Sequence, residues 1–563
     1  MDLQGDEIRK DEKRESREAE PEQELNKRTM AKQHSRTRNT IYNFTTSIGG
    51  QLVTTAMQFV VRTVFINTLG KSYLGIGGLF SNILSMLSLT EFGVGTAILF
   101  KLYDPIARHD HHRVAVLMKF YKTVYRGIGL VIALLGAAVI PLLPYLIKDF
   151  GKLQGLGLNA GVIFGIYLLK TVSSYLFFAY KSAIIKADQK QYLINLVSYL
   201  FTIGGAVAQI LCLVLYPKFE IYVMISVLEV IVQNVVVAIM ANRMYPFINE
   251  QTEDQLEKKE ILEIFKDCGA LFLYKLNTVV LKATDNIVIS SFIGLEMVGM
   301  YSNYHVLYTT IHTMFSRIFN AVGHSLGNLH TTHDLKHEYE VFEIVNLVTA
   351  ILGGTAFVGL FCVSDELVTQ WVGKEWVIAP PFSLLIGLEV YTLASRVALA
   401  RYRTTMGLFQ QAKWRPVAGM LINLIVSVLL VNVWGICGVL VGTLAAEWLV
   451  FMWFDPLIIH KYGFQNYKNV SCYYRRLVLY TVTSLAVGGV DWLICRHFFT
   501  GHGWFSVIVH MIICGVTTPA ALIGIMYKRQ EGQYMIKMVR RSWKKTLKKL
   551  RGKSRGGQEG RME

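Results

Sequence analysis

Apolar stretches long enough to cross a bilayer recur almost from one end of this chain to the other. About fourteen segments hold roughly 20 mostly apolar residues each, which is the length that a spanning helix needs. These segments are Ile41–Ile66, Ile76–Leu102, Tyr121–Ile147, Leu156–Tyr180, Tyr192–Tyr216, Ile221–Ala241, Ala270–Ile293, Val298–Val322, Phe342–Val363, Val377–Ala400, Pro416–Trp434, Gly435–Ile459, Leu477–Cys495 and Trp504–Tyr527. Lipid offers the backbone no hydrogen-bond partners, so the pattern predicts an all-α polytopic membrane protein.

Positive charge alternates between the loops. Lys101–Lys122 and Arg401–Arg415 are basic, whereas Asn67–Leu74 and Gly294–Met297 carry little positive charge. Because short cytoplasmic loops are enriched in Lys and Arg, every second loop is predicted to be cytoplasmic. An even number of spans then places both termini in the cytoplasm. The net charge of +17 lies mainly in these loops and in the tail, so no basic soluble module for nucleic acid is expected.

The two ends of the chain are charged. Residues 1–38 have no apolar core, which excludes a secretory signal there and predicts a disordered tail. The stretch Met535–Leu550 places apolar residues every three or four positions among Lys and Arg. That pattern predicts a helix on the inner leaflet, bound to anionic lipids. A docking site for another protein remains an alternative for the same stretch.

The sequence contains an internal repeat. Gly70 and Gly75 bracket the turn from the first predicted span into the second, and Gly294 and Gly299 bracket the turn from the seventh into the eighth. The second pair of glycines lies 224 residues after the first. A second repeated motif is Tyr180-Lys181-Ser182, which is similar to Tyr402-Arg403-Thr404, 222 residues later. Two parallel six-helix lobes around a central cavity are therefore expected, as in transporters that work by alternating access. The predicted parts are a tail 1–38, lobes 39–245 and 267–462 with a linker 246–266, two extra helices within 463–527, and a basic tail 528–563.

Ionisable residues inside the spans are candidates for function, because their burial in lipid is costly. In the seventh span, Lys275, Thr278, Lys282 and Asp285 share one helical face. This stripe could line a cavity for an anionic headgroup, or it could form ion pairs inside its lobe. Charges in other spans are Arg62, Glu91, Lys170, Glu229, Arg317, Glu389, Arg396 and Glu447.

The ionisable residues inside the spans fall into three groups according to the role expected of them. The predicted substrate-binding residues are the bases Arg62, Lys170, Lys275, Lys282 and Arg396. The candidates for coupling to an ion are the carboxylates Asp285, Glu389 and Glu447. Glu91, Glu229 and Arg317 are further polar groups within the membrane. Arg62 and Arg317 lie near span ends, so an anchoring role at the interface is an alternative for both.

No feature of the sequence predicts an enzyme, a cofactor or a metal site. No hydrolase triad and no ATP-binding domain is evident, and the seven cysteines are scattered without a C-x-x-C pair. The cluster His109, His111 and His112 is expected to be a solvated loop. Any energy for transport must then come from an ion gradient, the membrane potential or the substrate gradient.

The polar residues and glycines that interrupt the apolar segments of residues 40–460 resemble those of a known protein family. The matching motifs are Arg62-x-x-Phe65, Leu69-Gly70-x-x-Tyr73-Leu74-Gly75, Glu91-Phe92-Gly93-Val94-Gly95, Asp285-Asn286-x-Val288-Ile289-Ser290, Val298-Gly299-x-Tyr301-Ser302-Asn303 and Ser325-Leu326-Gly327-Asn328. They are similar to those of the oligosaccharide flippases, a branch of the multidrug/oligosaccharidyl-lipid/polysaccharide (MOP) exporter superfamily.

The resemblance implies a flippase of the bacterial cytoplasmic membrane that moves undecaprenyl-diphosphate-linked sugar units outward for polysaccharide synthesis. It implies a central cationic cavity, ion coupling, and a groove for the polyprenyl tail at the last two spans. A polysaccharide polymerase is a further candidate partner. The alternatives are a multidrug exporter of the same superfamily, a flippase for a peptidoglycan or teichoic-acid precursor, and a membrane scaffold in a polysaccharide assembly complex.

Overall fold

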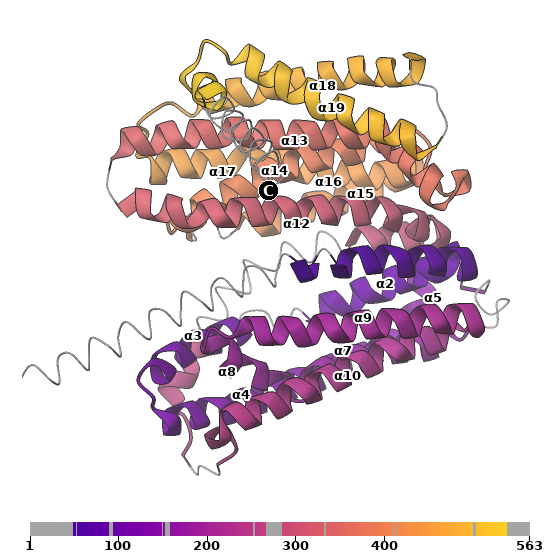
Figure 1. Cartoon of the computed structure of the whole chain (residues 1–563), viewed down its shortest axis with the longest axis vertical. Coiled ribbons are helices and arrows are strands. Elements are labelled where there is room, and N and C mark those ends of the chain that lie inside the picture. Colours follow the sequence, from indigo (N-terminus) through magenta and orange to yellow (C-terminus); the bar gives the residue numbers. More distant parts are fainter. Residues whose placement is uncertain are drawn as a thin grey trace, which may run out of the picture. The chain divides into compact units, whose positions relative to one another are not determined.

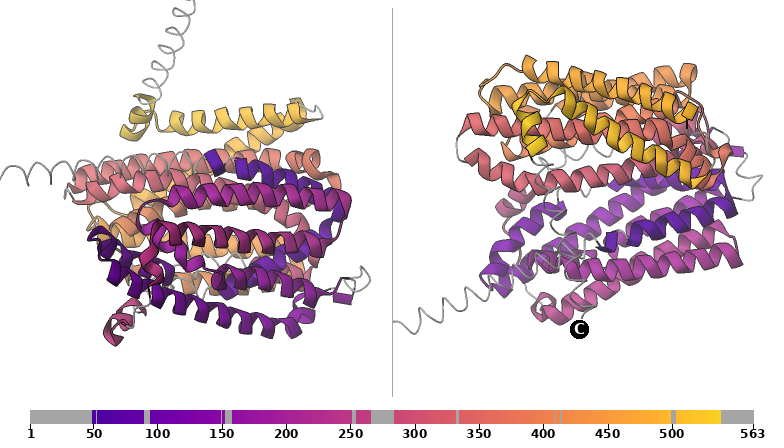
Figure 2. Two further views of the ribbon diagram at one scale, coloured as in Figure 1. Left: turned by 60° about the horizontal axis from the view of Figure 1, so that its bottom comes forward. Right: turned by 45° about the horizontal axis from the view of Figure 1, so that its top comes forward.

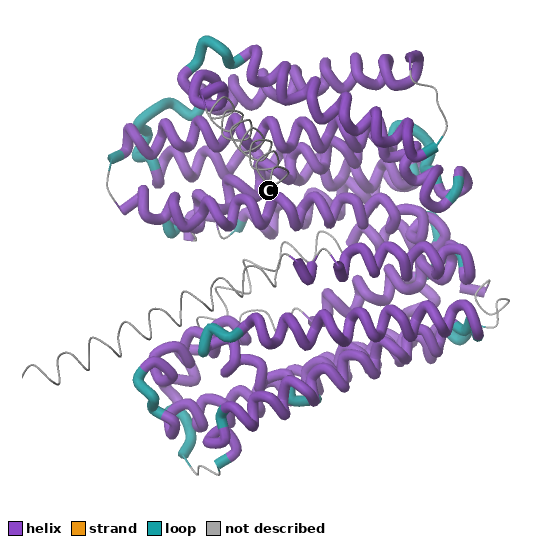
Figure 3. The backbone as a smooth tube through the Cα atoms, in the orientation of Figure 1, coloured by secondary structure: helices purple, strands orange, loops and turns teal. Residues whose placement is uncertain are grey.

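The computed structural model describes residues 49–51, 53–88, 94–148, 150–151, 158–250, 254–265, 284–331, 334–408, 410–412, 414–498 and 503–537. Over these ranges the regular elements are helices joined by short loops (Figure 3). Ten of the described helices are long and apolar enough to cross a membrane, or eleven if a bent pair at 160–187 counts as one span. The count of fourteen is not confirmed, and the predicted span Ala270–Ile293 lies mostly outside the described residues.

Close contacts divide the chain into two units. The first contains Met1–Thr68, Thr90–Ala138 and Gly161–Leu271, and the second contains Leu69–Leu89, Val139–Ala160 and Phe272–Glu563. This grouping follows spatial contact, so Leu69–Leu89 joins the helices of the later half. The lobe limits 39–245 and 267–462 stay predictions.

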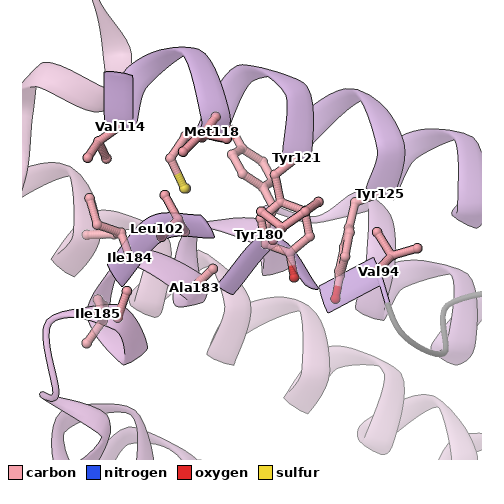
Figure 4. Packing of buried hydrophobic residues seen from close by; sticks show 14 of the residues in the cluster. Val94, Leu102, Val114, Met118, Tyr121, Tyr125, Tyr180, Ala183, Ile184 and Ile185 are labelled. Carbon is pink, nitrogen blue, oxygen red and sulfur yellow. The ribbon is translucent and has the colours of Figure 1, made fainter. Parts of the chain in front are cut away.

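The first unit is built from long helices and short connecting turns (Figure 1). Its elements are the helix Gly49–Leu69, α3 (Val94–Ala107), α4 (His111–Val139), α7 (Ala160–Leu176), η3 (Ala179–Lys181), α8 (Ser182–Ala187), α9 (Gln191–Leu215), α10 (Phe219–Met244) and η4 (Pro246–Asn249). Tyr121 and Tyr125 of α4 pack with Tyr180 and Ile184 in an apolar core (Figure 4). That core fixes the turns at one end of the unit, where Lys181 donates to Asn242 of α10.

The second unit holds more helices. They are α2 (Lys71–Leu87), η2 (Ile140–Leu142), α5 (Leu143–Leu146), residues 284–292, α12 (Leu295–Thr331), α13 (Leu335–Val372), η5 (Lys374–Trp376), α14 (Phe382–Thr405), η6 (Gln410–Ala412), α15 (Arg415–Trp434), α16 (Ile436–Ala446), η7 (Glu447–Phe451), α17 (Met452–Ile458), η8 (Ile459–Gly463), α18 (Ser471–Phe498) and α19 (Trp504–Ile525). α13, α18 and α19 lie side by side (Figure 2). Residues 530–537 form a further helix, and the rest of the predicted tail helix lies outside the described residues.

The repeated glycines meet in space. Gly70 (φ +88°) and Gly294 (φ +133°) precede α2 and α12 in backbone conformations that glycine adopts without strain. The two helices then cross near their N-termini: Gly75 lies against the backbone of Leu295, and Gly299 lies against the backbone of Lys71. A side chain at either glycine would overlap the partner's carbonyl oxygen. The 224-residue repeat therefore appears in the structure as a reciprocal helix crossing.

Further contacts hold the same end of the second unit. The Lys148 backbone N–H donates to Ser290 O at 3.2 Å, and the Lys148 ammonium donates to Phe292 O at 2.7 Å. The Ser290 hydroxyl in turn donates to Leu146 O at 2.8 Å. The Lys71 ammonium donates to Glu375 O and lies over the Trp376 ring. These bonds satisfy backbone carbonyls at helix ends, which would otherwise lack partners.

Candidate functional site

A basic cluster with one carboxylate lies within the first unit. Lys170 of α7 and Glu229 of α10 interact electrostatically, and the Thr202 hydroxyl of α9 donates to Glu229 Oε1 at 3.2 Å. Gly205, one turn after Thr202, lies against the Glu229 carboxylate, so the absence of a side chain there makes room for the acid. Three helices thus hold an acid and a base together among apolar residues. The sequence marks both ionisable residues because each lies inside an apolar span.

Arg62 belongs to the same unit and lies near an aromatic residue of α10. It interacts electrostatically with Tyr222 of α10, whose ring centroid lies 4.9 Å from that of Phe65. Tyr167 of α7 is a further neighbour of Tyr222. Arg62 and Lys170 contribute two positive charges against the single carboxylate Glu229. A guanidinium or ammonium in a water-poor setting binds a phosphate oxygen strongly, so this cluster suits an anionic group.

A cluster of oxygen atoms surrounds Asp285 in the second unit. The Thr443 hydroxyl of α16 lies 3.3 and 3.2 Å from the two Asp285 carboxylate oxygens. The Asn423 amide of α15 donates to Asp285 Oδ1 at 3.4 Å and to Thr443 at 2.9 Å. The Thr284 hydroxyl donates to Asn423 Oδ1 at 3.2 Å. Asp285, Asn423 and Thr443 are all buried.

The close approach of α15 and α16 builds this cluster. Gly435, with φ +57°, turns the chain between the two helices, and Gly442 lies against Ser427 and the backbone of Asn423. The Ser427 hydroxyl donates to Val439 O at 3.2 Å. One carboxylate, amide and hydroxyl oxygens and a main-chain carbonyl suit a proton or a hard monovalent cation. Within the described residues, no group of three or more His, Cys, Asp or Glu residues could hold a metal ion.

A second set of buried charges in this unit pairs internally. The Arg396 guanidinium of α14 binds the Glu447 carboxylate, and Arg403 Nη1 lies 3.2 Å from Asp455 Oδ1. Arg415 contacts the other Asp455 oxygen. Glu447 opens the π-helical turn η7, and the Arg396 and Arg415 guanidiniums both lie over the Phe451 ring of that turn. Arg396 and Glu447 therefore have each other as partners, which favours a structural role for both.

The remaining predicted site residues are spread over the chain. Lys275, Lys282 and Glu91 lie outside the described residues. Glu389 is buried in α14, near Tyr301 and Tyr308 of α12. Arg317 is exposed on α12, as an interfacial anchor would be. The structure thus brings Arg62 and Lys170 into one unit and Asp285 and Glu389 into the other.

Sequence reasoning missed the neutral partners of these charges. Asn423 and Ser427 lie one turn apart, as do Val439 and Thr443, and each pair faces Asp285 or its neighbours. The i, i+4 pair of polar side chains Asn423 and Ser427 in an apolar span is the signal that could have indicated this face of α15, whereas Val439 takes part only through its backbone carbonyl. Asp455 was also missed, although an acid in an apolar span between basic segments is conspicuous.

Comparison with known proteins agrees with the fold. Residues 166–381 match the family described as polysaccharide biosynthesis protein. The chain is similar to a structure of the lipid II flippase MurJ in an inward closed conformation, with a TM-score of 0.62 and 14% identity over 86% of this chain and 99% of that one. It is also similar to an inward-facing multidrug resistance MATE family transporter of the MOP superfamily, with a TM-score of 0.54 and 12% identity over 74% of this chain and 96% of that one. No curated protein matches it in sequence.

Proposed function

We propose that the chain is a multi-pass membrane transporter of the MOP exporter superfamily, and that it flips polyprenyl-diphosphate-linked oligosaccharide units across a bacterial cytoplasmic membrane. The observation that carries the proposal is the cluster of Arg62 and Lys170: Lys170 interacts with Glu229, and Tyr222 interacts with both Glu229 and Arg62. A diphosphate loses its water contacts on binding, and such bases replace them. The match of residues 166–381 to a polysaccharide biosynthesis family favours a glycan cargo over a drug.

The proposed transport cycle uses the Asp285 cluster as the ion site. A sodium ion or a proton bound by Asp285, Asn423 and Thr443 would neutralise a buried carboxylate in the second unit. Binding and release of that cation then bias the transporter between its conformations, which couples the ion gradient to movement of the glycolipid. Both termini are proposed to be cytoplasmic, from the alternation of positive charge in the loops.

Depletion of the protein tests the cargo. We expect one undecaprenyl-diphosphate-linked glycan to accumulate on the inner leaflet, measured by mass spectrometry of lipid extracts. Wild type should reverse the build-up, whereas Arg62→Ala or Lys170→Ala should leave flipping at least about tenfold slower, because each lost charge-assisted hydrogen bond is worth about 1.5–3 kcal/mol. Lys218→Ala is the matched control, since Lys218 is an exposed base of the same unit.

Two outcomes would move the assignment to another class. Drug sensitivity that rises on depletion, with no glycolipid build-up, would favour the multidrug exporter. Normal flipping by the Arg62 and Lys170 variants at wild-type membrane levels would contradict the proposed headgroup site and favour a scaffold. Accumulation of a peptidoglycan or teichoic-acid precursor would keep the mechanism and change the cargo.

Replacement of Asp285 tests the coupling. Asp285→Asn should abolish gradient-driven transport in proteoliposomes, because a neutral amide does not balance the charge of a bound cation. Thr443→Val removes one oxygen ligand and should weaken the dependence on the ion rather than abolish it. Asp365→Asn is the control, because Asp365 is a carboxylate of the same unit that accepts a hydrogen bond from Tyr304 at 2.9 Å rather than from Asn423 or Thr443. Gradients of sodium and of protons, imposed separately, identify the ion, and full activity of Asp285→Asn under both would overturn the coupling proposal.

A further inference from the structure

A cavity lies between α13, α14 and α18 in the second unit. It encloses about 400 Å³ of space with its open mouth included, and its interior admits a group of the size of a water molecule. Five aromatic rings line it: Tyr339, Phe342, Tyr391, Tyr473 and Tyr480. Glu343 and Arg476 bring charge to the lining. None of these residues belongs to the Asp285 cluster or to the Arg62 cluster.

The charges at this cavity are balanced. Glu343 Oε1 lies 3.2 Å from the Lys468 ammonium and 2.9 Å from Arg476 Nη2. Arg476 also contacts Glu531, which belongs to the helix at residues 530–537. Two acids thus face two bases. A ligand with a net charge would upset this balance, whereas a zwitterion would preserve it.

A lysine ammonium already contacts two of the residues that line the cavity. The Lys468 ammonium binds Glu343 and lies 4.8 Å from the centroid of the Tyr339 ring, which combines a carboxylate with an aromatic face. The Lys468 side chain is 43% exposed, so it can leave at little cost. Tyr480 also lines the cavity, and its buried hydroxyl has no hydrogen-bond partner among the described residues. The cavity therefore has a carboxylate and an aromatic face that can bind an ammonium. It also has the hydroxyl oxygen of Tyr480, which can accept a hydrogen bond from that ammonium.

Neighbouring aromatic residues place this cavity at the depth of lipid headgroups. Trp453 of α17 and Tyr474 of α18 stack with ring centroids 4.7 Å apart, and Trp453 is 53% exposed. Tyr462 and Tyr467 are also exposed nearby in sequence, alongside Lys461 and Lys468. Exposed Trp and Tyr among basic residues mark the boundary between lipid and water. A phospholipid headgroup is thus the ligand that this position meets.

We propose that the cavity binds the headgroup of a zwitterionic aminophospholipid. The primary ammonium replaces that of Lys468 on Glu343 and on the aromatic wall, and reaches the Tyr480 hydroxyl. Lys468 then turns to the lipid phosphate, so each charge keeps a partner. The narrow interior admits a primary ammonium and excludes the bulkier trimethylammonium group of choline lipids.

Binding of short-chain lipids to the purified full-length protein in detergent tests the proposal. Phosphatidylethanolamine is expected to bind about tenfold more tightly than phosphatidylcholine of equal chain length, a preference that corresponds to about 1.4 kcal/mol. The measurement is a titration followed by native mass spectrometry. Tyr480→Phe leaves the ion pairs intact and should reduce the preference several-fold, and Glu343→Gln should remove it. Val482→Ala, on an exposed part of α18, is the control and should bind as wild type does.

Three results would overturn the proposal. The first is equal affinity for the two lipids in the wild-type protein. The second is an unchanged preference in Tyr480→Phe and in Glu343→Gln, with both variants folded by their thermal unfolding curves. The third is binding of free ethanolamine as tight as that of the lipid, which would identify a soluble amine as the ligand. The measurement involves no transport, so its result is independent of the glycolipid assay.

Discussion

Alanine at Gly75 or at Gly299 is expected to abolish most transport while the protein still reaches the membrane. Each new methyl group would overlap a backbone carbonyl of the other helix, at Leu295 or at Lys71, and a backbone cannot rotate away as a side chain can. Overpacking of this kind costs about 1–3 kcal/mol, which is about a 5- to 150-fold change in the population with α2 and α12 crossed. The measurement is surface polysaccharide production at matched protein levels.

The same helix supplies the control for this experiment. A side chain at Gly78, one turn beyond Gly75, would meet Val298 at 3.5 Å, an ordinary contact, so Gly78→Ala should transport normally. Labelling of a Ser72→Cys variant by a membrane-impermeant maleimide reports whether the crossing has opened. If Gly75→Ala transports and labels as Gly78→Ala does, the crossing has no part in the cycle.

Asp455→Ala is expected to destabilise the protein by about 3–5 kcal/mol, because it removes the carboxylate that faces two buried arginines. Arg403 lies 3.2 Å from Asp455, and Arg415 contacts its second oxygen. The Asp455 side chain is fully enclosed, so water cannot replace it. A fall in the midpoint of thermal unfolding in detergent measures the effect.

An exposed ion pair gives the matched comparison. Asp104 lies 2.9 Å from Arg108, and both side chains are largely exposed, so Asp104→Ala should cost about 0–1 kcal/mol. The two variants remove the same chemical group and differ in burial. Equal unfolding midpoints for the two variants would show that the buried arginines are stabilised by other means.

The length of the apolar segments predicted the approximate positions of the helices. It was a poorer guide to the residues at which the helices begin and end. Residues Ile76–Leu102 were predicted as one span, but the structure has α2 ending at Leu87 and α3 beginning at Val94. The tenth span was predicted from Val377, and α14 begins at Phe382. Two prolines, Pro380 and Pro381, precede it, and proline lacks the N–H that a helix interior requires. Hydropathy does not register that constraint.

The candidate sites were predictable to the extent that they carry charge. Asp285, Lys170 and Glu229 each stand out as ionisable residues in apolar spans. Asn423 and Thr443 do not, because neutral polar residues are common in spanning helices and only tertiary packing brings these two to Asp285. The pairing of Arg396 with Glu447 is likewise a fact of packing, since the two are 51 residues apart.

The crossing of α2 and α12 has the geometry of a symmetric homodimer. Residue 75 touches residue 295 and residue 299 touches residue 71, so each contact is repeated with the roles of the two helices exchanged. In a dimer of identical subunits, a two-fold axis produces this reciprocity: if residue i meets residue j, then residue j meets residue i. The crossing is what a half-length ancestor would have formed with its own copy. Fusion of two genes would have preserved it, and each glycine would since have been held in place by the backbone of the other half.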